Sequence, residues 1–262
     1  CAIAMAEGKR KGTQAVERVV LLLNALSTRR QVGWRLVDLA ARCELDKGTA
    51  HRILTALIRH RMVVQRQRDR HYLPGPLLFE LGLSLTAHHK FQRSCEASAA
   101  RISKMSCGMG CFFLRSGPEM LCAARHTLVN AATVEPGMRR PLVSSAAGIA
   151  ILVLLRAAER QAIVSENFEF IRRYGGDSIP ALKRMLRRSE KLGFGINESD
   201  LVPSWNTLGM AMCDPSGAPF GALMVAGPAN RLSFDRLDHW VAMLRSEILL
   251  LEEAAARAGL WE

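Results

Sequence analysis

The feature that most constrains the fold is a set of three helical patterns within residues 13–59, the last two separated only by residues 43–46. Apolar residues recur at three- and four-residue spacing in GTQAVERVVLLLNAL, WRLVDLAARC and KGTAHRILTALIRH, which predicts three amphipathic helices. Thr13 is placed to cap the first helix through its hydroxyl, with Glu17 in its first turn, and Asp46 is placed to cap the third. A tight turn before the last of three helices predicts a helix-turn-helix.

A short hairpin with a basic turn follows these helices. Residues 62–64 and 72–73 are apolar and flank a run of Arg and Asp, which predicts two strands joined by an exposed wing. The first turn of the third helix meets base edges in such folds, where Arg or Lys can pair with guanine or phosphate and a small residue lets the backbone approach. The expected DNA contacts are Lys47, Gly48, Thr49, His51, Arg52, Arg66, Arg68 and Arg70. The alternatives are a solvated helix face and a loop without function.

The distribution of charge favours a polyanionic partner at one end. The chain carries a net charge of +12, of which residues 1–90 hold 16 Lys and Arg against 7 Asp and Glu, a net of +9. Residues 91–262 hold 20 against 17, a net of only +3. Nucleic acid is the commonest partner of such a basic domain, and a general solubility surface is the alternative.

The remaining sequence predicts a second domain of a different class. Leu77, Leu78, Leu81 and Leu85 predict a connector helix, after which helical and strand patterns alternate. Helices are expected at 91–104, 145–156, 159–173, 178–191 and 233–257, and strands at 109–115, 119–125, 193–198, 207–213 and 219–226. This order predicts an α+β fold with an antiparallel sheet. The predicted organisation is a DNA-binding domain at 1–75, a connector helix at 76–90 and a sensor domain at 91–262.

Several classes of protein are disfavoured. The seven cysteines are odd in number and scattered, which favours free thiols in a reducing, cytoplasmic compartment (Cys1, Cys43, Cys95, Cys107, Cys111, Cys122 and Cys213). No apolar run approaches the roughly 20 residues of a membrane span. The Cys107–Cys111 pair lacks further metal ligands, so we expect neither metal nor cofactor. The start, CAIAMAEGKRKG, shows no secretory pattern and suggests a trimmed or engineered end.

Enzyme motifs are also missing from the sequence. A Cys122–His126 pair can be drawn on paper, but no nucleophile elbow or phosphate-cradling loop surrounds it. We therefore expect no enzymatic activity, with a hydrolase as the disfavoured alternative.

The ordered motifs resemble the IclR family of bacterial transcriptional regulators over residues 12–257. The resemblance is carried by GTQAVERVVLLLNAL, LVDLAARCELDKGTAHRILTALIRHRMV, HYLPGPLLFELG, GMRRPLVSSAAGIAILVLL, GFGINESDL and LGMAMCDPSGAPFGALMVAGPANRL. It implies a winged helix-turn-helix, a connector helix and a GAF-like effector-binding domain. Val143 stands where His is usual, Ile149 where Lys is usual, and Ala226 replaces a Ser. These departures leave the identity of the effector open.

The resemblance also implies a small ligand between the sheet and the loop that opens the central helix. Ser145, Ala146 and Ala147 correspond to that loop, whose backbone N–H groups suit a carboxylate. Trp205, Thr207, Met224 and Ala226 correspond to the sheet side. Their apolar character, where relatives sensing small oxoacids are polar, predicts an aromatic carboxylic acid. The alternatives are that Trp205 and Met224 are core residues and that Arg125 and His126, candidate second anchors, lie at the surface.

The sequence therefore predicts a ligand-responsive regulator that binds double-stranded operator DNA and senses a small organic acid. The family leads us to expect a homodimer and a dimer of dimers, with no membrane partner. The alternative is a metabolite-sensing interaction module without sequence-specific DNA binding.

Overall fold

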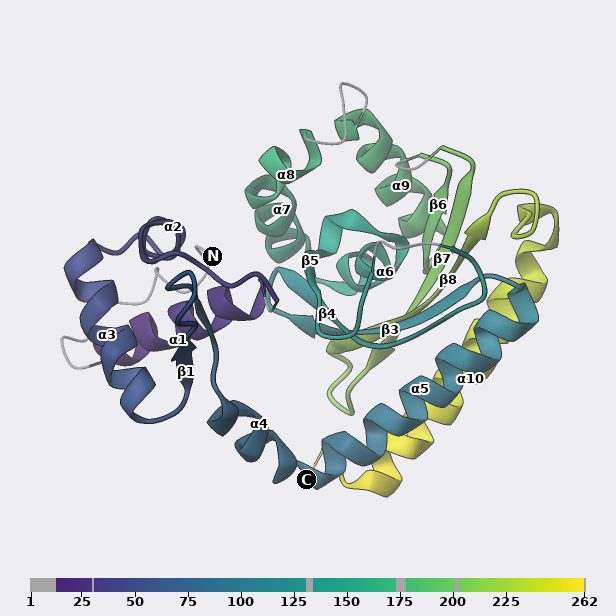
Figure 1. Ribbon diagram of the computed structural model, residues 1–262. Coiled ribbons are helices and arrows are strands. Elements are labelled where there is room, and N and C mark those ends of the chain that lie inside the picture. The colour runs from purple at the N-terminus through teal and green to yellow at the C-terminus, as the bar shows by residue number, and fades with distance from the viewer. Residues whose placement is uncertain (1–12, 30, 131–133, 173–177, 201–202, 262) are drawn as a thin grey trace. The chain divides into compact units, whose positions relative to one another are not determined.

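The computed structural model describes residues 13–29, 31–130, 134–172, 178–200 and 203–261 (Figure 1). Contacts divide the chain into unit 1, Cys1–Thr86, and unit 2, Ala87–Glu262. The division lies within the segment expected as a connector. Within the described ranges, no helix combines the length and the apolar character that crossing a membrane requires.

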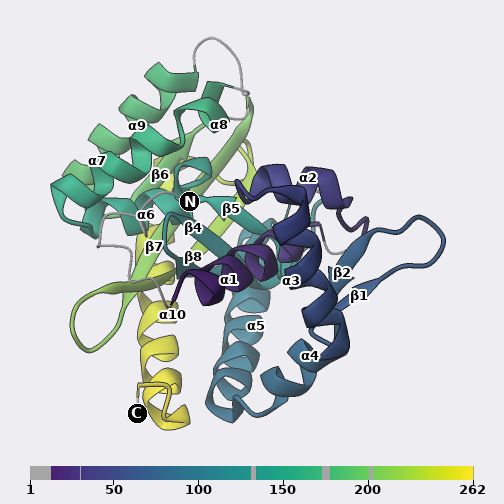
Figure 2. The same cartoon turned by 90° about the vertical axis from the view of Figure 1, so that its left-hand side faces the viewer.

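Unit 1 confirms the predicted winged helix-turn-helix. Its elements are α1 (Gln14–Ser27), α2 (Leu36–Arg42), α3 (Lys47–Arg59), β1 (Val63–Gln65), β2 (Tyr72–Pro74) and α4 (Pro76–Leu83). The helices pack around buried Leu22, Leu39 and Leu54. The antiparallel β1–β2 hairpin projects from the helices (Figure 2). One capping prediction is wrong: the Thr13 hydroxyl makes no capping hydrogen bond to the start of α1 and donates to the Glu17 carboxylate at 3.4 Å.

The predicted connector helix at 76–90 is interrupted. The helix α4 ends at Leu83, and α5 (Thr86–Ser106) begins after a two-residue break. The Ser84 hydroxyl donates to the Leu81 carbonyl at 2.7 Å. Gly82 and Ser84 are also poor helix formers, because one is flexible and the other competes for backbone hydrogen bonds. The apolar periodicity across this segment concealed the break.

Unit 2 confirms the predicted α+β fold, with six antiparallel strands in the order β5-β4-β3-β8-β7-β6. The strands are β3 (Met109–Ser116), β4 (Glu119–Thr127), β5 (Arg139–Pro141), β6 (Gly195–Glu198), β7 (Trp205–Cys213) and β8 (Pro219–Pro228). The helices are α6 (Ala146–Leu154), α7 (Ala157–Glu166), α8 (Phe168–Arg172), α9 (Ser178–Leu192) and α10 (Leu237–Ala258), with single 3-10 turns at Leu142–Ser144 and Phe234–Arg236. Two details differ from expectation: β5 replaces part of a loop, and Asn167 separates α7 from α8.

Each face of the sheet has its own core. Cys111 and Phe113 of β3 pack into the cluster that contains α6, whereas Phe112 between them packs into the cluster that contains α5 and α10. This alternation is that of a strand buried on both faces. In Figure 1, α5 and α10 run together along one face and α6 lies on the other. The α6 face carries the expected effector residues.

Candidate functional site

The start of α3 is fixed by its cap. The Asp46 carboxylate accepts a hydrogen bond from the Thr49 backbone N–H at 2.8 Å, as the sequence predicts for an N-cap. Hydrogen bonds from Thr49 hold the pKa of Asp46 below its usual value, so the cap is ionised at neutral pH. The first turn of α3 therefore has a defined position.

The expected recognition residues of α3 lie together on this turn. Lys47, Gly48, His51 and Arg52 are exposed, and Thr49 is half-buried. The Arg52 guanidinium donates to the Thr49 hydroxyl at 3.3 Å. On the opposite face of α3, Ala50 and Leu54 are fully buried in the interior of unit 1. The arrangement presents donors on one face and anchors the other, which is what major-groove readout needs.

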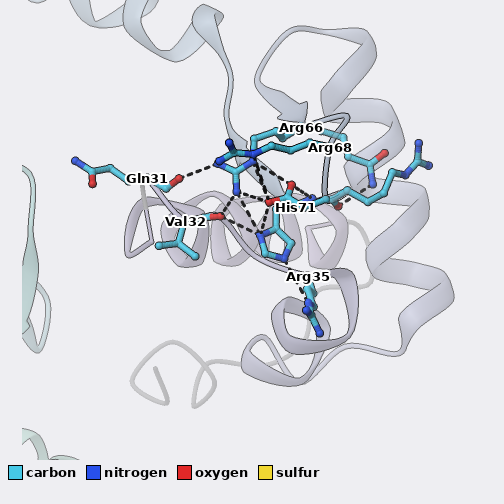
Figure 3. A network of polar contacts seen from close by, with 9 residues as sticks. Gln31, Val32, Arg35, Arg66, Arg68 and His71 are labelled. Atoms are coloured by element: carbon cyan, nitrogen blue, oxygen red, sulfur yellow. Dashed lines mark hydrogen bonds and ion pairs between the residues drawn. The ribbon is translucent and has the colours of Figure 1, made fainter.

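The three arginines expected on the wing have different environments. Arg68 is 77% exposed, and Arg70 is exposed beside it with a left-handed φ of 59°. Arg66 is only 23% exposed, and its guanidinium donates to the backbone carbonyls of Gln31 and Val32 (Figure 3). The donors of Arg66 are thus used inside unit 1, and its expected DNA contact stays a prediction. Its partners lie more than thirty residues away in sequence, so no local pattern indicated them.

The four sheet residues expected at the effector site share one face. Thr207 on β7 lies opposite Ala226 on β8, and the next pair on the same face of the sheet is Gly209 with Met224. Met224, Ala226 and Trp205 belong to the core cluster on the α6 side. Thr207, two residues along from Trp205, faces the same side because side chains alternate along a strand.

The other three expected residues begin α6 and are packed tightly. The Ser145 hydroxyl caps the helix by accepting from the Gly148 N–H at 3.4 Å. Ala146 and Ala147 are fully buried, and a Cβ built on Gly209 would lie 2.5 Å from the Ala146 carbonyl oxygen. The backbone of α6 thus rests directly on β7. This contact leaves no space between α6 and β7 at Gly209, and the expected carboxylate anchor at the start of α6 stays a prediction.

A surface hollow of about 450 Å³, open to solvent and called the cavity below, lies at the end of the sheet where β4 and β8 end and β7 begins. Its lining residues are Leu128, Val129, Asn130, Trp205, Pro228, Asn230 and Arg231. Of the seven expected effector residues, only Trp205 contributes to it. The sequence did not indicate the other six lining residues, because they lie at or just after the ends of β4 and β8. Only the strand register brings those ends together. One signal for polar groups at the cavity was present in the sequence: the segment GPANRL contains Asn230 and Arg231.

One buried hydroxyl on this face lacks a partner. The Thr207 hydroxyl is shielded from solvent and finds no hydrogen-bond partner among the residues that the structure describes. In the same row of the sheet, the Thr127 hydroxyl donates to the Val129 carbonyl at 2.9 Å. An unpaired buried hydroxyl is costly, and a ligand can provide the missing bond.

The two side chains of the candidate nucleophile pair, Cys122 and His126, face opposite sides of the sheet, and of the candidate metal pair Cys107 is exposed whereas Cys111 is buried. Cys122 packs on the α6 side, while His126 pairs with Gly110, between the inward Met109 and Cys111, and so faces the other side. A register shift near Phe112 produces this change of face. Across the described part of the chain, no group of three or more His, Cys, Asp or Glu is placed to hold a metal ion.

Arg125, a candidate second anchor, is largely shielded from solvent. Its side chain is 15% exposed and pairs with Glu135, and its backbone lies opposite Cys111. Its charge is thus already balanced within unit 2.

Comparisons with known proteins extend over nearly the whole chain. The model of the IclR helix-turn-helix domain matches residues 15–67. The repressor AllR of Salmonella typhi is 27% identical over 232 residues, covering 86% of this chain and 84% of AllR. The regulator KdgR of Escherichia coli K12 is 24% identical over 243 residues, covering 88% and 89%.

Solved structures share the fold. A putative IclR regulator from Silicibacter sp. TM1040 has a TM-score of 0.78 at 19% identity, covering 92% of this chain and 96% of that one. An IclR homologue from Microbacterium hydrocarbonoxydans, in complex with 4-hydroxybenzoate, has a TM-score of 0.67 at 17% identity, covering 93% and 99%.

Proposed function

We propose that the chain, as a transcriptional regulator of the IclR family with an N-terminal helix-turn-helix domain, binds operator DNA through α3 and the wing and responds to a small aromatic carboxylic acid bound in unit 2. The observation that carries the first part is the capped, exposed first turn of α3. Lys47, Gly48, Thr49, His51 and Arg52 contact base edges and phosphates, while Arg68 and Arg70 on the wing contact phosphates.

The cavity at the end of the sheet supports the acid. Trp205 offers an aromatic surface for a ring, and Arg231, with Asn130 and Asn230, offers donors for a carboxylate. Met224 and Ala226 lie on the same face of the sheet but are buried in the core and do not line the cavity. The 4-hydroxybenzoate bound by the Microbacterium homologue is a ligand of this class. In this proposal the carboxylate binds at Arg231, not at the start of α6.

Self-association is proposed from the apolar surface of unit 1. The helix α4 buries none of its side chains, and Phe79, Leu81 and Leu83 on it are 69%, 52% and 53% exposed. Val16 and Val20 of α1 are also exposed. Exposed apolar surface of this kind marks interaction sites, and we assign it to a second copy, because a dimer presents two copies of α3 to two half-sites.

Regulation then follows from population shift. An acid changes operator occupancy only by its difference in affinity between DNA-competent and incompetent dimers. A regulator of this type acts where the DNA is, in the cytoplasm.

The test is a thermal-shift screen of the purified chain against aliphatic and aromatic carboxylic acids. An acid at about 100 times its dissociation constant stabilises the native state by roughly 2.7 kcal/mol. We expect a rise in Tm with aromatic acids, and the same acids should change DNA binding. A response confined to two- and three-carbon oxoacids would contradict the aromatic assignment, and acids that stabilise the chain without changing DNA binding would contradict the regulatory one.

A further inference from the structure

An acidic residue lies among the arginines of the wing. The Asp69 carboxylate accepts from Arg66 Nε at 3.0 and 3.1 Å and from Arg66 Nη2 at 2.6 Å. It also accepts from the His71 backbone N–H at 3.2 Å. One carboxylate thus holds both sides of the turn between β1 and β2. The hydrogen bond from Arg66 keeps the pKa of Asp69 well below its usual range, so the carboxylate is ionised at any physiological pH.

The Arg66 guanidinium also joins the wing to the loop after α1. Its guanidinium donates to the Gln31 carbonyl at 2.9 Å and to the Val32 carbonyl at 2.6 Å (Figure 3). A planar guanidinium that makes several bonds at once has few orientations left. The wing is therefore connected to a segment more than thirty residues earlier.

A second set of hydrogen bonds in the same network involves His71. Arg35, next to the start of α2, donates from Nε to His71 Nε2 at 3.4 Å. Because arginine cannot accept, His71 Nε2 is the acceptor and Nδ1 donates to the Val32 carbonyl at 3.0 Å. His71 is 16% exposed and Asp69 is 32% exposed, whereas Arg68 is 77% exposed. The network lies at the base of the wing, and the mostly exposed Arg68 reaches it through an ion pair, its Nε lying 4.0 Å from the Asp69 carboxylate.

We propose that Asp69 is a positioning residue for DNA recognition, which fixes Arg66 against the 31–32 loop and so holds the wing with Arg68 and Arg70 available to phosphates. This inference depends on the proposed function, in which the wing contacts DNA. The proposal reverses the usual direction in which removing an acidic residue changes DNA affinity. Removing an acid from a basic DNA-binding unit ordinarily strengthens binding, because it raises the positive charge facing the phosphates. Here the removal weakens binding.

The test compares Asp69→Asn with Asp38→Asn in the full chain, on one double-stranded DNA fragment that the wild type binds. Asp38 is an exposed acid of α2, so both variants lose the same charge. Affinity is measured over a range of salt concentrations. We expect Asp69→Asn to bind several-fold more weakly, with a salt slope reduced by about 1 to 2, since each phosphate contact contributes about 0.9. Asp38→Asn should bind as well as the wild type or better.

Combination with two further variants separates positioning from loss of fold. Arg68→Ala should reduce the salt slope in the wild type but not in Asp69→Asn, because the contact is already lost there. Arg52→Ala should weaken binding equally in both backgrounds. Unchanged or tighter binding by Asp69→Asn with an unchanged salt slope would overturn the proposal, as would loss of the Arg52→Ala effect in Asp69→Asn. Failure of Arg52→Ala to weaken wild-type binding would instead count against the proposed function.

Discussion

Replacing Thr207 by Val should stabilise unit 2 in the absence of ligand. The two side chains have nearly the same shape, but Val removes a hydroxyl that is shielded from solvent and has no hydrogen-bond partner among the described residues. An unsatisfied buried hydroxyl costs about 1 to 3 kcal/mol. For a unit of this size, each kcal/mol changes Tm by about 2 to 4 °C. We therefore expect calorimetry on the full chain to record a higher Tm for the transition of unit 2.

Thr127 supplies the matched control for this substitution. It lies in the same row of the sheet, but its hydroxyl donates to the Val129 carbonyl and accepts from the Val129 N–H. Thr127→Val should therefore lower Tm. An equal fall in Tm for Thr207→Val and Thr127→Val would refute the reasoning, because it would mean that the Thr207 hydroxyl has a partner, such as an ordered water.

Four other predictions follow from the same structure. Arg52→Ala should weaken operator binding by about tenfold to a hundredfold in a fluorescence anisotropy titration, because it removes a base or phosphate contact. Trp205→Ala should weaken binding of an aromatic acid by about tenfold in calorimetric titration and leave DNA binding of the ligand-free protein unchanged. Gly209→Ala should destabilise unit 2 by about 1 to 3 kcal/mol, because its Cβ would lie 2.5 Å from the Ala146 carbonyl oxygen. Because the pKa of Asp69 is lower in the folded chain than in the unfolded one, its stabilising effect is present above about pH 4 and is lost below it; the Tm of Asp69→Asn should approach that of the wild type as pH falls from about 5 to about 2.

Local signals in the sequence were sufficient to predict the helices of the helix-turn-helix. Asp46 caps α3 as predicted, because a cap depends only on residues within one turn. The break at Ser84 was missed because a side chain bonding to its own backbone competes with helix, and this competition leaves no trace in apolar periodicity.

Long-range contacts explain the remaining differences. Arg66 reads as a free cation in sequence, but Gln31 and Val32 lie far enough away that only the fold reveals their carbonyls as its partners. The cavity is likewise lined by the residues that follow β4, the end of β8 with residues that follow it, and the first residue of β7, so Trp205 could be expected there while Arg231 could not. Every described strand of the sheet except β5 was predicted, but the register that brings their ends together was not.

Sequence-specific DNA binding is tested most directly by selecting duplexes from a random-sequence DNA pool with the purified full chain, beside its Arg52→Ala variant. The wild type should enrich one motif, repeated at a fixed half-site spacing, and Arg52→Ala should lose or relax the preference at one position of each half-site. Retention of DNA without enrichment of any sequence would refute sequence-specific binding and favour a metabolite-sensing module that does not read sequence.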